Sequence, residues 1–142
     1  MMIGFGRGSR RSRYPRLEIK MLSRMSAVQA FSAFVSLALT PARATRYSGL
    51  ANRPKGQKRV LDSLYHDFER AIRPDAKRRA VDRRARCYAY HSSLGFGAEF
   101  PSVAEAYSKL GSDDGWLIIV SDGSAGIYRP ESRWDAAVEI AG

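Results

Sequence analysis

The side chains suited to recognising a charged ligand gather between Arg73 and Tyr90, where a basic run is followed by two tyrosines. An arginine guanidinium offers paired donors to a phosphate, and a tyrosine ring offers a face on which a base can stack. This composition indicates DNA or RNA binding through residues 73–86. The candidate contacts are Arg73, Lys77, Arg78, Arg79, Arg83, Arg84, Arg86, Tyr88 and Tyr90. The basic track can continue into the preceding stretch through Arg46, Arg53, Lys55, Lys58 and Arg59. The alternative is a solvated basic surface that pairs with acidic residues elsewhere.

Cys87 and His91 fall on one side of a predicted strand over residues 87–91. A thiol and an imidazole can serve as nucleophile and base or as two metal ligands, but either chemistry needs a third group that the nearby sequence lacks. A buried thiol beside an imidazole is the simpler interpretation. The aspartates at 113, 114 and 122 adjoin glycines, as turns require. The sequence therefore predicts no catalytic residue, no metal site and no cofactor, and it favours binding over catalysis.

The N-terminal part of the chain has the layout of a secretory signal peptide. Basic residues precede an apolar stretch over residues 26–40 that holds no formal charge, and Pro41 follows it. Ala42 and Ala44 then offer the small-x-small pattern of a signal cleavage site. The apolar stretch is too short for a membrane span, so we expect no transmembrane segment in the mature chain. The alternative is that residues 26–39 form a buried helix of a cytoplasmic protein.

Charge is distributed unevenly along the chain. Residues 1–44 carry a net charge of +7, residues 45–90 carry +8, and residues 91–142 carry −5. A basic half followed by an acidic half indicates either a face for a polyanion or pairing between the two halves. The single cysteine excludes an intramolecular disulfide.

Behind these side chains, the clearest predicted element is an amphipathic helix over residues 57–72, whose apolar residues share one face. Pro74 ends that helix, and a second, mostly solvated helix is expected from Asp75 to about Arg86. The later elements are a loop over 92–100, a helix capped by Ser102 and Glu105, a buried strand over 116–120, a hairpin partner over 126–129 and a terminal helix beginning at Ser132.

These elements predict an α+β fold, with a small three-stranded sheet covered by helices and preceded by a cleavable or disordered N-terminal segment. The expected organisation is a signal-like segment over 1–44, a flexible arm over 45–56 and the α+β domain over 57–142. The first functional hypothesis is an exported, periplasmic or secreted bacterial protein that binds an unknown protein or small molecule without catalysis. Its contact surface would be the Trp116–Tyr128 hairpin and the exposed face of the sheet. The second is a cytoplasmic basic accessory protein that binds DNA or RNA through residues 73–86.

Overall fold

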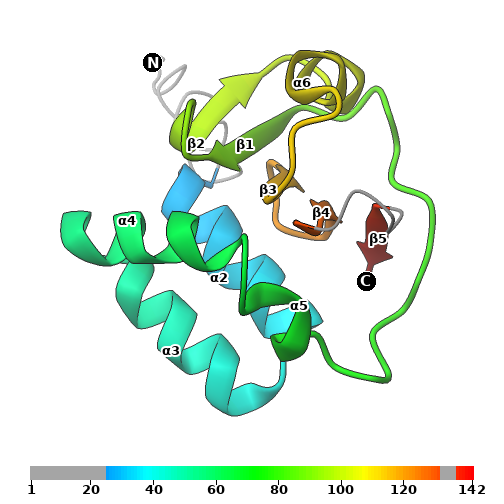
Figure 1. Ribbon diagram of the computed structural model, residues 1–142. Helices are drawn as coiled ribbons and strands as arrows, with labels where there is room; N and C mark the ends of the chain where they lie inside the picture. The colour runs from blue at the N-terminus through cyan, green and yellow to red at the C-terminus, as the bar shows by residue number, and fades with distance from the viewer. Residues whose placement is uncertain (1–24, 132–136) are drawn as a thin grey trace, which may run out of the picture.

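The fold is built on one antiparallel sheet of five strands, in the order β2-β1-β3-β4-β5, with helices on both faces (Figure 1). The computed structural model describes residues 25–131 and 137–142. Its strands are β1 (Cys87–His91), β2 (Gly95–Phe100), β3 (Trp116–Val120), β4 (Ala125–Arg129) and β5 (Val138–Ala141). Its helices are α2 (Ala27–Ala38), α3 (Pro41–Ala51), α4 (Pro54–Ser63), α5 (Phe68–Ala71) and α6 (Val103–Leu110).

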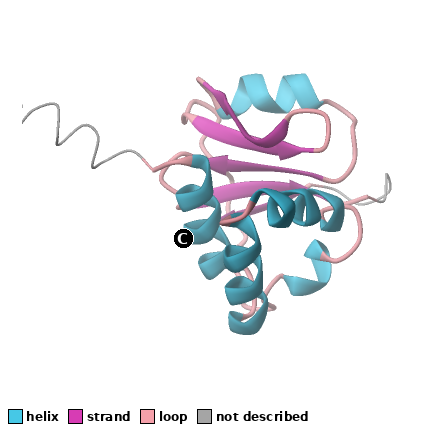
Figure 2. Cartoon of the chain, turned by 90° about the vertical axis from the view of Figure 1, so that its left-hand side faces the viewer, coloured by secondary structure: helices cyan, strands magenta, loops and turns pink. Residues whose placement is uncertain are grey.

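Both faces of the sheet are covered, which explains why its central strand is apolar throughout. Leu117 and Ile119 of β3 point to the side of α2–α5, whereas Trp116 and Ile118 point to the side of α6. Figure 2 shows α6 on one side of the strands and the other helices on the opposite side. The Trp116–Tyr128 hairpin therefore lies at the centre of the molecule, and all four of these β3 side chains are fully buried.

Helix α2 forms the main contact of the larger helical layer with the sheet. It begins in a capping box, in which Ser26 and Gln29 satisfy each other's backbone amides. Phe31 and Phe34, spaced three residues apart on one helix face, are buried against the strands. The ring of Phe34 lies close to the backbone of Gly126 in β4: a methyl group added at Gly126 would lie only 2.7 Å from the ring.

The expectation that the N-terminal segment is disordered is therefore wrong for residues 25–44, whereas its removal by cleavage stays a prediction. Residues 27–38 are helical and supply five buried side chains to the core. Cleavage after Ala44 would take this helix away from the sheet. The sequence is ambiguous because a signal peptide and a buried helix share the same short, uncharged, apolar composition. Residues 1–24 lie outside the described part of the chain.

Three of the expected helical and loop boundaries also need correction. The stretch over 45–56, expected to be a flexible arm, contains most of α3 and the first turn of α4. The helix expected over 57–72 is divided into α4 and α5 by a turn. The helix expected over 75–86 is absent: the segment is extended beside strand β5, where the amide of Ala141 donates to the carbonyl oxygen of Lys77 at 3.2 Å, and it then turns at Asp82–Ala85.

The expected three-stranded sheet is wrong, because the sheet has two further strands, β2 and β5, at its edges. Strand β2 occupies most of the stretch expected to be a loop over 92–100, and β5 replaces the end of the expected terminal helix. The beginning of that expected helix, including Ser132, falls in the undescribed residues 132–136. Strand β1, the hairpin of β3 and β4, and helix α6 lie where the sequence places them. The cap of α6 is present as a hydrogen bond from the Glu105 amide to the Ser102 hydroxyl at 3.1 Å.

Within the ranges that the structure describes, no helix has both the length and the apolar character needed to cross a membrane.

Candidate functional site

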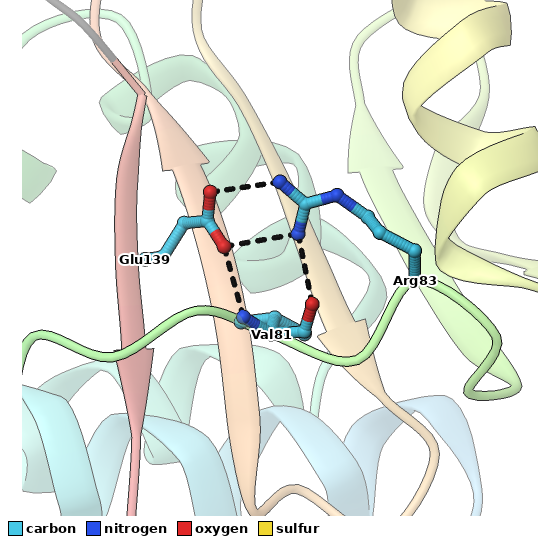
Figure 3. A network of polar contacts seen from close by, with 3 residues as sticks. All are labelled: Val81, Arg83 and Glu139. Atoms are coloured by element: carbon cyan, nitrogen blue, oxygen red, sulfur yellow. Dashed lines mark hydrogen bonds and ion pairs between the residues drawn. The ribbon is translucent and has the colours of Figure 1, made fainter.

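The basic segment over residues 73–86 runs along the outer edge of β5 and is partly engaged in holding the fold together. Arg83 makes two hydrogen bonds to the Glu139 carboxylate, at 2.9 and 2.8 Å, and Glu139 also accepts from the Val81 amide at 2.9 Å (Figure 3). The bond to Arg83 is the main cause that lowers the pKa of Glu139. Arg83 also lies 5.5 Å from the centre of the Tyr107 ring. We therefore assign Arg83 a structural role at the sheet edge.

Other predicted contacts in this segment are paired or buried. Arg73 pairs with Asp75, Arg84 with Asp82 and Arg86 with Glu99, at 3.2, 3.9 and 3.3 Å. Tyr88 and Tyr90 are buried, and their hydroxyls donate to the carbonyl oxygens of Met25 and Ala27, each at 2.6 Å. Because their rings lie under α2, they offer no free face to a base.

Lys77, Arg78 and Arg79 are the members of the predicted basic set that remain exposed without an acidic partner among the residues described. They follow one another in an extended segment, so their side chains alternate in direction. The structure therefore does not gather the predicted contacts of residues 73–86 and the two tyrosines into one site.

Cys87 and His91 do not meet. Four residues of extended strand separate their backbones by about 13 Å. Cys87 is buried on the α6 side of the sheet, and burial is the main cause that raises the pKa of its thiol to about 12. His91 is 5% exposed, and its Nε2 lies 3.1 Å from Tyr65 Oη. Its Nδ1 accepts from the Ser93 amide at 3.2 Å and so helps to fix the turn between β1 and β2.

The aspartates serve turns and one ion pair. Asp122 accepts from the amide and the hydroxyl of Ser124, at 3.0 and 2.6 Å. Asp114 lies 3.8 Å from the Arg129 guanidinium. In residues 25–131 and 137–142, no group of three or more histidine, cysteine, aspartate or glutamate side chains is placed to hold a metal ion.

Among the residues that the structure describes, helices α3 and α4 and the turn between them present the strongest exposed concentration of positive charge. We call this region the α3–α4 surface, and define it by Arg43, Arg46, Arg53, Lys55, Lys58 and Arg59. All six side chains are exposed, and none pairs with a carboxylate in the part of the chain that is described. The sequence contains no aspartate or glutamate between Thr40 and Leu61 to offset them.

The sequence itself explains how these charges are held in place. Pro41 and Pro54 each begin a helix, a position where the missing amide costs nothing. Gly56 lets α4 pass directly over the end of α3, since a side chain there would begin 2.0 Å from the Leu50 carbonyl oxygen. Tyr47 anchors the inner side of α3 against the rings of Phe31 and Phe68. The outer sides of both helices are thereby left to the basic residues.

Two open hollows lie on the α3–α4 surface and share Leu50 and Arg59. The first, of about 490 Å³, is the more polar of the two: Arg43, Arg46 and Arg59 line it together with Asp62 and Asp67. The second, of about 650 Å³, has a mostly apolar lining from Leu50, Pro54 and Gly56, with Arg53 and Lys55 at the same site. Because two residues belong to both, the hollows adjoin each other.

Five of the six surface cations are visible in the sequence as an extension of the basic track. Arg43 is missed because it falls inside the segment expected to be removed, just before Ala44. The absence of acidic residues between Thr40 and Leu61 is the feature of the sequence that distinguishes this surface. Residues 73–86 lack this feature, because they include Asp75 and Asp82.

Comparison of the chain with known protein families, curated proteins and solved structures found no match.

Proposed function

We propose that the protein binds nucleic acid, and that the α3–α4 surface is its contact face. The observation that carries this proposal is the set of six exposed cations on two adjoining helices and the turn between them, unopposed by carboxylates along the same stretch of sequence. Arginine matches phosphate geometry with two parallel donors, and four of the six are arginines. Lys77, Arg78 and Arg79 form a separate, smaller basic group on the edge segment, outside the proposed contact face.

The proposal includes a compartment. A protein with this function keeps residues 25–44 and acts in the cytoplasm, where nucleic acid is present. The burial of Phe31 and Phe34 supports this, because removal of α2 would expose the sheet face that they cover. The measurement is the N-terminus of the protein isolated from its native host. A mature chain that begins at Thr45 would overturn this part of the proposal.

The central experiment measures binding of a fluorescent oligonucleotide as a function of salt. Each phosphate neutralised by the protein contributes about −0.7 to −0.9 to the slope of log K against log salt. Replacing Arg46, Lys55, Lys58 and Arg59 together with serine should flatten this slope by about 3 units and weaken binding at least about 100-fold at low salt.

The matched control removes the same charge from the edge segment. It replaces Lys77, Arg78, Arg79 and Arg84 with serine, and leaves Arg83 in place for its bond to Glu139. We expect this variant to bind within a few-fold of the wild type. Equal losses in the two variants would show that net charge alone drives binding and would refute the assigned surface. No binding at low salt would refute the function itself.

A further inference from the structure

We infer that the α3–α4 surface selects single-stranded nucleic acid, with a phosphate in its polar hollow and a base in the adjoining apolar hollow. This inference rests on the proposed function and names the form of nucleic acid that the same surface takes. It depends on two features described above: the difference in lining between the hollows, and the two residues that they share.

The polar hollow is suited to a phosphate on its arginine side. Arg43 and Arg46 are three residues apart on α3, so they lie on one helix face, and Arg59 approaches from α4. Asp62 and Asp67 line the same hollow and oppose an anion there. Replacing Asp62, an exposed residue, with asparagine should therefore strengthen binding of an oligonucleotide by a few-fold.

The apolar hollow is suited to a nucleobase. Leu50 is half-buried and Pro54 is exposed, and together they offer an apolar lining, while the guanidinium groups of Arg53 and Arg59 are available to stack on a flat ring. The bases of a duplex are stacked and paired, so their faces cannot enter such a hollow. An unpaired strand can place one base there while its phosphate contacts Arg59, the charged residue that lines both hollows.

The test compares the binding of four fluorescent probes at low salt: oligo-dT, oligo-rU, an abasic single strand and a duplex. Every strand, including each strand of the duplex, carries the same number of phosphates. Stacking of one base is worth about a 10-fold gain in affinity. We therefore expect the two base-bearing single strands to bind about 10-fold more tightly than the abasic strand and the duplex. A difference between oligo-dT and oligo-rU measures the combined effect of the 2′-hydroxyl group and of the thymine methyl group.

A variant then locates the base. Leu50→Ala should remove most of the difference between oligo-dT and the abasic strand while leaving the salt slope unchanged. The matched control is Leu94→Ala, a half-buried leucine on the α6 side of the sheet. The comparison of probes on the wild-type protein needs no variant, so it decides the question even if Leu50→Ala unfolds the chain.

The outcomes separate this inference from the function on which it rests. Equal binding of all four probes, or tightest binding of the duplex, overturns the base hollow and leaves nucleic-acid binding standing. If Leu50→Ala remains folded and keeps the full preference for oligo-dT, the base lies elsewhere and the inference is overturned. Failure of every probe to bind overturns both.

Discussion

Replacing Phe34 with alanine tests whether α2 is a permanent part of the core. The ring is 1% exposed and lies directly on the backbone of β4 at Gly126. Truncating a buried phenylalanine to alanine costs about 3–5 kcal/mol, from the lost transfer free energy and the cavity left behind. The whole free energy of unfolding of a domain is about 5–15 kcal/mol, so the variant should lose a large part of its stability.

Urea denaturation followed by tryptophan fluorescence measures this loss, since Trp116 is fully buried in the native sheet. With a denaturant dependence of about 2 kcal/mol per M, the urea midpoint should fall by about 1.5–2.5 M. Ser36→Ala is the control, because Ser36 is exposed on the same helix. Its effect should stay within about 0.5 kcal/mol.

The result that would refute this reasoning is a loss below about 1 kcal/mol for Phe34→Ala in the full-length chain. That value is ordinary for an exposed side chain, and it would mean that α2 does not pack on the sheet in solution. A mature chain that lacks residue 34 altogether would lead to the same conclusion.

Three further predictions concern the helix crossing, the sheet edge and the thiol. Gly56→Ala should destabilise the protein by about 1–3 kcal/mol in urea, because the added methyl group meets the backbone of Leu50; an unchanged midpoint would contradict the close crossing. Since Arg83 lowers the pKa of Glu139, the stability contributed by this pair is complete above the ordinary glutamate pKa and is lost as the pH falls through the lowered value. Glu139→Gln should therefore reduce the loss of stability with acid, as measured by urea midpoints from about pH 7 to pH 3, and an unaltered pH profile would exclude the pair. Cys87, with a pKa raised to about 12, should react with a thiol reagent at about pH 8 on the order of 1,000-fold more slowly in the native protein than in urea; equal rates would place the thiol at the surface.

The strands with a strong local pattern could be predicted from the sequence, and the edge strands could not. The alternation at residues 87–91 and the apolar run at 116–120 identify β1 and β3 without help from their partners. Strand β2 contains Gly95 and Gly97, both with positive φ, and such glycines are typical of loops. Here they accompany a bulge opposite β1, at Ala89 and Tyr90. Residues 95–100 form a strand because they pair with β1, and this pairing cannot be read from their own sequence.

The charged residues of the α3–α4 surface could be recognised in the sequence, but their grouping in space could not, because the grouping depends on how the helices pack. Lys58 and Arg59 could be recognised as members of a basic track. Their partnership with Arg43 depends on α2 and α3 being part of the fold, which the composition of residues 26–44 did not settle. In the opposite direction, Arg83 looked equivalent to its basic neighbours until Glu139, 56 residues later, was placed beside it.

Phe34 packs on Gly126, a residue that the ribosome adds to the chain 92 residues later. A ribosome adds about 5–20 residues per second, so α2 is synthesised roughly 5–20 seconds before the end of β4, the strand that Phe34 covers. During this interval its apolar face has no sheet to pack on. The nascent protein thus presents a short apolar helix, preceded in the sequence by basic residues, to the factors that bind new chains until β4 has been synthesised.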